Sequence, residues 1–197
     1  EPATYLAFAL NTGGGTAGRT LSPGWSIHAR DRFANVDVNF SGPITVVLFN
    51  GPTAIATLSG TTTRNAVNGV ADFNDLSVNV PNSSWVLNAS SPGLAGAQSA
   101  AFSIGIAARM TLLNTPLVPL GGTATLRVET SVPSYGTGLV VALSPNSAGV
   151  VSVNAPASVT LPVGDSIVDF TLTGVSSGFM FLNATVDGNG AGQLGVT

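Results

Sequence analysis

The sequence has no cysteine and no lysine, and it has a single histidine. Without cysteine there is no disulfide, no thiolate nucleophile and no cysteine-ligated metal. Without lysine there is neither a Schiff base nor a lysine–asparagine isopeptide bond, and one histidine cannot build a multi-histidine zinc site. We therefore expect no cofactor and no metal centre in this chain.

Charge is also scarce, because charged residues make up only 8% of the 197 residues and the formal net charge is −3. The six arginines are scattered and form no basic cluster that would displace counterions from phosphates, which excludes a nucleic-acid partner. No apolar run approaches the ~18 residues of a membrane-spanning helix, so we expect no membrane insertion. The chain begins at Glu1 rather than at Met, and we expect it to be a processed or excised piece.

The residues that are abundant favour β-structure. Hydrophobic residues make up 44% of the chain, and 24 glycines and 12 prolines separate them into short stretches. These stretches recur at roughly 8–12-residue spacing and alternate apolar with polar side chains, as half-buried strands do. Examples are Thr4–Leu10, Trp25–Asp31, Ile44–Phe49, Val70–Val78 and Ser84–Ala89. The sequence therefore predicts an all-β fold built as a β-sandwich.

The chain also repeats itself at a separation of roughly 95 residues, which is the signature of a duplicated unit. Three segments recur in order: Val70–Phe73 as Ile167–Phe170, Leu87–Ser90 as Leu182–Thr185, and Thr45–Leu48 loosely as Leu139–Ala142. We expect two sandwich domains, residues 1–106 and 107–197, joined near Ile104–Ala108. Because this joint is short and has no Gly/Ser/Pro run, we expect a stiff, end-to-end pair.

Three motifs of the first half resemble a bacterial immunoglobulin-like (Ig-like) repeat. They are Asp31-x-Phe33-x-Asn35-Val36, the segment Asn68–Ser77, and Ala101-Phe102-Ser103. Such repeats occur in long tandem arrays of surface and secreted proteins, and they are similar to the modules of the invasin and intimin type. The resemblance covers most of residues 1–106, and the second half is similar to a looser Ig-like type. This sequence departs from the repeat at Ala34, where the repeat usually has Gly, and at Pro81–Ser84, which lacks the usual Ala-Gly turn. The resemblance implies two tandem immunoglobulin-like β-sandwiches with an extracellular or cell-surface location.

The segment His28–Asp37 gathers much of the scarce charge, and it has two interpretations. Alternation along the strand places Trp25, Ile27 and Ala29 inward and leaves Ser26, His28 and Arg30 outward. The corresponding strand of the second half has Leu126 and Val128 inward and Arg127 and Glu129 outward. This favours a solvated sheet face with cross-strand charge pairs, followed by a loop in which Asp31 and Asn35 hydrogen-bond their own backbone. The alternatives are a ligand site formed by Arg30, Asp31, Arg32, Asn35 and Asp37, or catalysis by His28.

Other motifs give no catalytic residue. Gly174–Gly178 matches the Gly-x-Ser-x-Gly nucleophile pattern, but strands are expected on both sides, so we interpret it as a β-turn. Asp72 and Asp75 would point to opposite faces of a strand, and the equivalent positions of Asp72 and Asp169 indicate a structural role. Asp187–Gly190 resembles the start of a calcium loop without its remaining ligands, and we expect a hairpin turn there.

Two further residue types have ordinary interpretations. We expect Trp25 and Trp85 to fill the core rather than to stack on sugars. The Asn-x-Ser/Thr triplets at Asn39, Asn82, Asn88 and Asn183 match the number expected by chance, so they do not by themselves indicate glycosylation. The joint has no acidic residue between Gly105 and Thr115, which argues against stiffening by calcium.

The resulting hypothesis is a non-catalytic pair of modules that spaces or presents neighbouring domains of the same protein. One alternative is an adhesin that recognises a glycan or protein receptor through the loops Asp31–Ser41 and Ser131–Gly138, because loops on a rigid scaffold often carry recognition. Another is a self-associating filament subunit that pairs through weakly charged sheet edges. An enzyme is the least favoured alternative.

Overall fold

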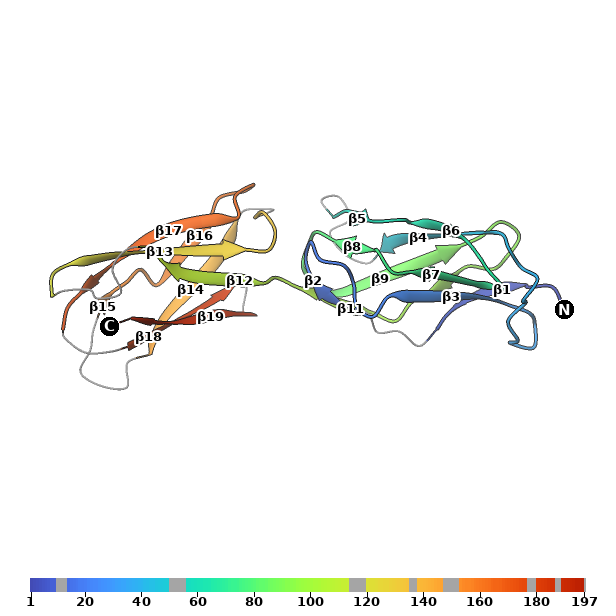
Figure 1. Cartoon of the computed structure of the whole chain (residues 1–197), viewed down its shortest axis with the longest axis horizontal. Coiled ribbons are helices and arrows are strands. Elements are labelled where there is room, and N and C mark those ends of the chain that lie inside the picture. The colour runs from blue at the N-terminus through green and yellow to red at the C-terminus, as the bar shows by residue number, and fades with distance from the viewer. Residues whose placement is uncertain are drawn as a thin grey trace. The chain divides into compact units, whose positions relative to one another are not determined.

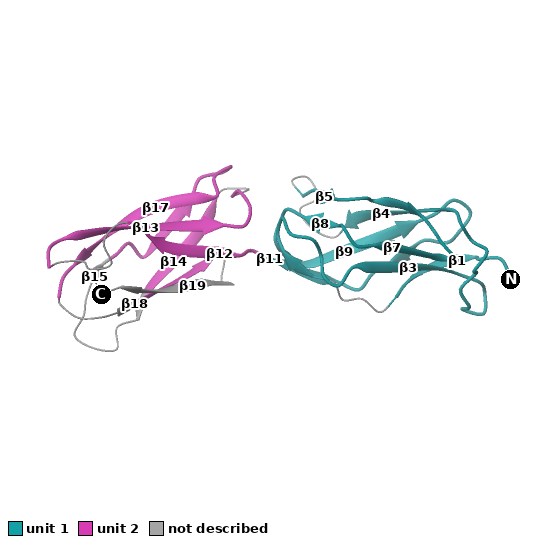
Figure 2. Cartoon of the chain, viewed as in Figure 1, with its two compact units in different colours: residues 1–105 teal, residues 106–197 magenta. Residues whose placement is uncertain are grey.

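The computed structural model describes residues 1–9, 14–49, 56–113, 120–134, 138–146, 153–176, 180–186 and 189–196, and every element among them is a β-strand (Figure 1). The described residues include no helix long and apolar enough to span a membrane. The chain forms two compact units, Glu1–Gly105 and Ile106–Thr197 (Figure 2). The predicted all-β fold with immunoglobulin-like sandwiches is confirmed.

Unit 1 has two main sheets. The smaller sheet has the strand order β1-β3-β7, with β1 Tyr5–Phe8, β3 Trp25–Arg30 and β7 Val70–Phe73. The larger has the order β2-β11-β9-β4-β6, and β10 also pairs with β9. Its strands are β2 Gly15–Thr16, β4 Pro43–Phe49, β6 Thr63–Asn65, β9 Asn82–Ser90, β10 Ala97–Gln98 and β11 Phe102–Gly105. A short separate pair is formed by β5 Leu58–Ser59 and β8 Ser77–Val78.

Unit 2 is built the same way from two four-stranded sheets. One has the order β12-β13-β17-β15, with strands β12 Ala108–Leu112, β13 Thr123–Thr130, β15 Val153–Asn154 and β17 Ile167–Gly174. The other has the order β16-β14-β18-β19, with strands β14 Leu139–Asn146, β16 Ser158–Leu161, β18 Met180–Val186 and β19 Asn189–Val196. The antiparallel pairs β3–β7 and β4–β9 of unit 1 recur as β13–β17 and β14–β18.

The strand pairing corrects one of the sequence matches. Val46 lies opposite Ala89, and in unit 2 the residue opposite Ala184 is Leu143. Val46 therefore corresponds to Leu143 and not to Val140, as the match of Thr45–Leu48 with Leu139–Ala142 required. The match fails because a shift of three residues exchanges the two faces of a strand: Val46 is buried, whereas Val140 is exposed.

The core of each unit follows the predicted alternation. Trp25, Ile27 and Ala29 of β3 are buried, as are Leu126 and Val128 of β13. The rings of Trp25 in one sheet and Phe102 in the other lie 5.2 Å apart, so the two sheets of unit 1 meet across this core. Trp85 is also buried, which confirms that both tryptophans are core residues. Burial of each large apolar side chain contributes about 1.5–3 kcal/mol, and this sandwich has no disulfide to supplement it.

Two outer strands of unit 1 are partly covered by the chain itself. The amide of Leu6 in β1 donates to the carbonyl of Ala95 at 2.9 Å, and the amide of Ala95 donates to Thr4 at 3.0 Å. Beside β2, the amide of Ala17 donates to the carbonyl of Gly105 at 2.8 Å. These edges are therefore less open to pairing with another chain than isolated edge strands would be.

Candidate functional site

The loop between β3 and β4 is organised by Asp31. This side chain is only 3% exposed, and its Oδ1 accepts hydrogen bonds from the amides of Phe33 and Asn35, both at 2.9 Å. The Asn35 amide group donates to Oδ2 at 3.3 Å. Burial raises the pKa of the Asp31 carboxyl, but the hydrogen bonds from Asn35 and Phe33 outweigh it, so the pKa lies below 3.8. Asp31 and Asn35 therefore stabilise the loop, as the alternation predicted.

The same loop holds the segment that leads into β1. The Oδ2 atom of Asp37 accepts a hydrogen bond from the amide of Ala3 at 2.9 Å, and the carbonyl of Arg30 accepts one from Thr4 at 2.7 Å. Arg32 donates to the Glu1 carboxylate at 2.8 Å, in a pair that is largely exposed. Three of the predicted ligand-binding residues are thus bonded to the incoming chain.

Arg30 and His28 lie on the outward face of β3. One guanidinium nitrogen of Arg30 donates to the carbonyl of Ala34 at 3.1 Å, and the other lies 3.3 Å from Nδ1 of His28. Burial and then the charge of Arg30 lower the pKa of His28 below 6.5, while Asp72 opposes this shift. A neutral imidazole can accept this contact from Arg30, so the histidine helps to hold the residue that supports the loop.

The feature that the sequence analysis missed is the exposure of apolar side chains at this end of unit 1. Phe33 is 64% exposed, and the guanidinium carbon of Arg32 lies 4.7 Å from the centre of its ring. Val38 is exposed in the same loop, and Val67 is 71% exposed in the neighbouring β6–β7 turn. The amide of Gly69 in that turn donates to the loop carbonyl of Phe40 at 3.0 Å. The only available signal was Phe33 itself, an aromatic residue between Arg32 and Ala34 in a predicted loop.

The equivalent loop of unit 2 also holds an incoming segment. The amide of Ser131 donates to the carbonyl of Ala107 at 2.7 Å, and Ser131 Oγ accepts from the amide of Ala107 at 3.3 Å. Ser134 is buried and donates from its hydroxyl to the carbonyl of Leu161 at 3.0 Å. Residues 135–137 of this candidate loop lie outside the described residues.

The predicted cross-strand charge pairs are present in unit 2. Arg127 donates two hydrogen bonds of 2.8 Å to Asp169, which lies directly opposite it on β17. Arg109 of β12 donates one hydrogen bond to Glu129, which lies directly opposite it on β13. The hydrogen bond from Arg127 holds the pKa of Asp169 below its ordinary value. In unit 1 the residue opposite exposed Asp72 is Ser26, so the equivalent pair is missing at that register.

The other candidate motifs bring no reactive groups together among the described residues. Gly174 ends β17 and Met180 begins β18, so strands flank the Gly-x-Ser-x-Gly motif, whose Ser177 and Gly178 lie outside the described residues. Asp187 and Gly188 of the calcium-like motif also lie outside them. The described part of the chain contains no group of three or more metal-binding side chains.

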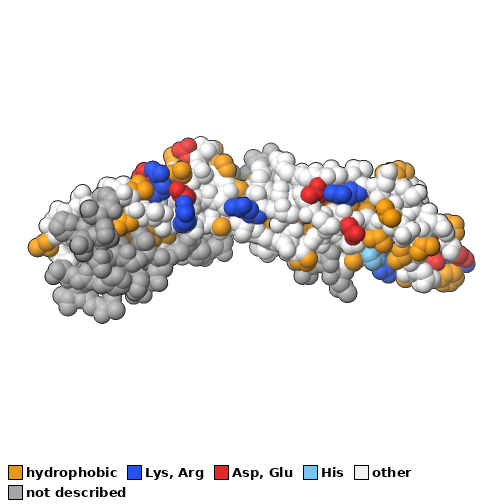
Figure 3. All heavy atoms as spheres, in the orientation of Figure 1, with side chains coloured by type: hydrophobic (Ala, Val, Ile, Leu, Met, Phe, Trp, Pro, Cys, Tyr) orange, Lys and Arg blue, Asp and Glu red, His pale blue; other side chains and the backbone are white. Residues whose placement is uncertain are grey.

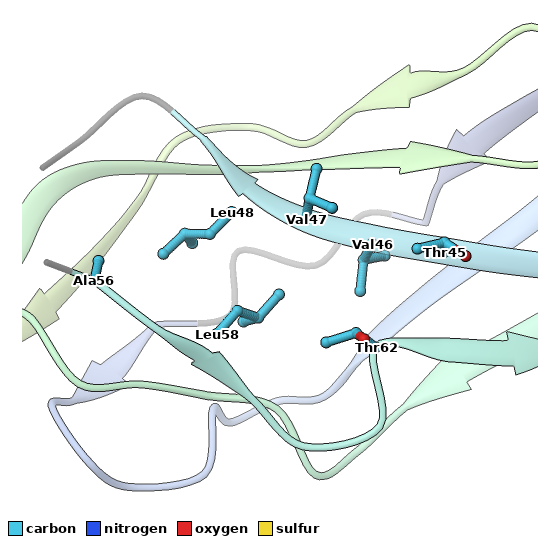
Figure 4. Close-up of a pocket in the computed structure, with 7 residues that line it drawn as sticks. All are labelled: Thr45, Val46, Val47, Leu48, Ala56, Leu58 and Thr62. Carbon is cyan, nitrogen blue, oxygen red and sulfur yellow. The ribbon is translucent and has the colours of Figure 1, made fainter. Parts of the chain in front are cut away.

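The described residues of unit 1 line hollows on its surface. One of about 280 Å³ lies between β4 and β5, where Val46, Leu48 and Leu58 point toward one another (Figure 4). The side chains that line it are aliphatic apart from Thr45 and Thr62, so they include no group for acid–base chemistry. Another, of about 470 Å³, is lined by Arg64, Asn65, Val67, Val70 and Asp72.

No protein-family model and no curated protein sequence matches the chain. Among solved structures, the D0-D1 domain of intimin is 14% identical and matches 96% of this chain and 97% of its own, with a TM-score of 0.39. Invasin, a bacterial integrin-binding protein, is 18% identical over 98% of this chain and 38% of its own, with a TM-score of 0.47. Domains 4–9 of the surface layer protein SbsC are 16% identical over 100% of this chain and 31% of their own, with a TM-score of 0.34. The chain thus spans less than half of the invasin and SbsC structures. Intimin and invasin are also the proteins named in the sequence resemblance.

Proposed function

We propose that the chain is a non-catalytic pair of Ig-like modules that spaces or presents neighbouring domains of a bacterial surface or secreted protein. The proposal rests on the way each unit holds its incoming chain. In unit 1, Arg30 at the end of β3 holds Thr4 and Asp37 in the following loop holds Ala3. In unit 2, Ser131 after β13 holds Ala107. A segment bonded to its module has fewer conformations than a free linker, which suits a spacer.

The connection between the units supports the same function. Only Ile106 and Ala107 separate the end of β11 from the start of β12, and Ala107 is one of the bonded residues. Short connections with few free residues restrict the relative motion of domains. We therefore propose that the joint acts as a restrained hinge rather than as a flexible linker.

Spin-label distance measurements test this proposal directly, because the chain has no cysteine to interfere. Labels attached to Ser83→Cys and Ser158→Cys report the distance between the two units, and both positions are exposed. We expect a narrow distance distribution in the unchanged chain. In Ser131→Gly it should broaden, because the variant loses the hydroxyl that accepts from Ala107 and because glycine makes the backbone at the joint more flexible. Ser90→Gly, an exposed change away from the joint, is the control. A broad distribution that Ser131→Gly leaves unchanged would contradict the spacer function.

A second candidate function is adhesion through the loop after β3, and exposed Phe33 favours it. Its amide is fixed by Asp31 and its ring is stacked with Arg32, so the aromatic side chain is presented on an ordered backbone. Exposed, preorganised aromatic and arginine side chains are common centres of binding interfaces. The partner would be a protein receptor or a glycan, with Arg30, Asp31 and Asp37 supporting the loop.

A glycan array and a pull-down with the two-unit chain test this second function. We expect Phe33→Ala to lower binding at least tenfold, because it removes the exposed ring and leaves the Asp31 hydrogen bonds in place. Ile167→Ala, which removes an exposed apolar side chain from β17 of unit 2, is the control. Equal binding by both variants and the unchanged chain would exclude the loop as the binding surface.

A further inference from the structure

Among the strands of unit 1, outward-facing charged side chains occur on one sheet. The β1-β3-β7 sheet presents Arg30, His28 and Asp72 on its outward face. In the larger sheet, the strands contain a single charged residue, Arg64. Arg64 lies opposite buried Ile44 in the strand register and forms an ion pair of 3.0 Å with Asp75. The outward face of the larger sheet is therefore uncharged.

Unit 2 has the same asymmetry, although its sequence differs. The β12-β13-β17-β15 sheet contains Arg109, Arg127, Glu129 and Asp169, which form the two ion pairs described above. Red and blue side chains lie next to each other on this unit in Figure 3. The strands β14, β16, β18 and β19 of the other sheet contain no charged residue. The separation of charge between the two sheets is thus repeated in both modules.

The uncharged face of unit 1 combines apolar side chains with neutral hydrogen-bonding groups. Val47 and Phe49 project from β4 and are 53% and 51% exposed. The hydroxyls of Thr45 and Thr63 lie 2.8 Å apart on this face, and Gln98 donates to Asn88 at 3.1 Å. We call this surface the uncharged face, and define it by Thr45, Val47, Phe49, Thr63, Asn88 and Gln98.

We propose that the uncharged face of one chain binds the same face of a second copy of the chain. Charged side chains on a sheet normally oppose unwanted association, and both modules retain them on only one sheet. A charged partner would lose hydration against this face without gaining an opposite charge. A second copy brings neutral amides, hydroxyls and apolar side chains, and it meets no like charge even though the chain has a net charge of −3.

This interaction differs from the edge-to-edge pairing that the sequence suggested. The edges at β1 and β2 are already bonded to Ala95 and Gly105, whereas the described residues place nothing over Val47 and Phe49 that buries them. Contact between faces buries side chains without requiring any change in the hydrogen bonds of the sheets. It is also compatible with a two-fold axis, since identical surfaces meet.

Sedimentation velocity over a concentration range of about 10 μM to about 1 mM tests the proposal. We expect a dimer whose fraction rises with concentration and does not change between roughly 0.05 and 0.5 M salt, because no ion pair forms. Val47→Lys introduces a charge twice into a symmetric interface, and we expect it to weaken association at least tenfold. Thr63→Lys, on the neighbouring edge strand, provides a second exposed variant with the same expected direction.

Thr171→Lys is the matched control, because it adds the same charge at an exposed position on the charged sheet of unit 2. Thermal unfolding of each variant confirms that the fold is retained. The proposal is overturned if the chain stays monomeric throughout the concentration range. It is also overturned if Val47→Lys and Thr171→Lys have equal effects, or if salt dissociates the dimer.

Discussion

At the scale of single residues, the few ionisable side chains of unit 1 mainly hold backbone. Asp31 fixes its own loop, Asp37 holds the chain that leads into β1, and Asp75 ties the segment before β6 to the end of β7. Each of these three carboxylates accepts more than one hydrogen bond from nearby amides or hydroxyls. Loss of one such group is therefore expected to loosen a loop rather than to abolish a reaction.

Asp75 gives a pH dependence with a defined sign. Hydrogen bonds from the Thr61 side chain and then from Arg64 lower the pKa of Asp75 from 3.8 to about 2. A carboxyl whose pKa is lower in the folded state stabilises the fold above pH 3.8, and this contribution is lost as the pH falls toward 2. We expect Asp75→Asn to be less stable than the unchanged chain at pH 6 in urea unfolding. The difference should shrink toward pH 2, and a constant difference across this range would contradict the assignment.

The two tryptophans give a second comparison at this scale. The indole nitrogen of Trp85 donates to the carbonyl of Val80 at 2.9 Å, whereas that of Trp25 is buried without a partner among the described residues. Replacing Trp85 by Phe removes a buried hydrogen bond, while the same change at Trp25 removes an unsatisfied donor. We expect Trp85→Phe to cost about 1 kcal/mol more than Trp25→Phe in chemical denaturation. Equal costs would mean that the Trp85 hydrogen bond contributes nothing to stability.

At the scale of elements, the exposed end of unit 1 depends on contact between the β6–β7 turn and the loop after β3. Gly69 in the turn has φ +80°, and a Cβ there would lie 2.4 Å from the carbonyl oxygen of Asp37. Gly93 has a similar φ of +79°, but a Cβ would meet nothing within 4 Å. Substitutions at these two glycines therefore separate the free-energy cost of the backbone conformation from that of the close contact with Asp37.

We expect Gly93→Ala to destabilise unit 1 by about 1 kcal/mol, because alanine disfavours a positive φ. Gly69→Ala should cost at least twice as much, because it also forces the turn away from the loop. Denaturant unfolding followed by tryptophan fluorescence measures both variants in unit 1. Similar costs for the two would show that the loop moves aside easily, and that Phe33 is not presented on a rigid support.

At the scale of the whole molecule, both tryptophans of the chain lie in unit 1, so their fluorescence reports on that unit alone. Far-ultraviolet circular dichroism reports on the strands of both units. Leu126 is fully buried in unit 2, and we expect Leu126→Ala to destabilise that unit by about 2–5 kcal/mol. The dichroism transition should then shift or split in urea while the fluorescence transition stays in place.

Ile27→Ala is the control for this experiment, because Ile27 is fully buried in unit 1 and its loss should move the fluorescence transition. If Leu126→Ala moves both transitions together, the two units unfold as one cooperative body. Such a result would contradict independent modules and would place much of the stability in the joint.

Much of the fold of this protein can be predicted from the sequence alone, because the side chains of a strand alternate between two faces. The alternation around Trp25–Arg30 and Thr125–Glu129 predicted which residues are buried, and the internal repeat predicted that the same sandwich occurs twice. The role of Asp31 and Asn35 was also predictable, since short polar side chains bind nearby backbone in turns. These features depend on residues that are close in the sequence.

Only the tertiary structure decided the features that depend on distant residues. It joined Asp37 to Ala3 and Arg32 to Glu1, and it showed that the loop with the predicted ligand residues holds the incoming chain. It left Phe33 and Val67 exposed in two loops that contact each other, and it shifted the register of β14 relative to the sequence match. Local periodicity determines which face a side chain occupies. The partners on that face are set by how strands far apart in the chain pair and how the loops between them meet.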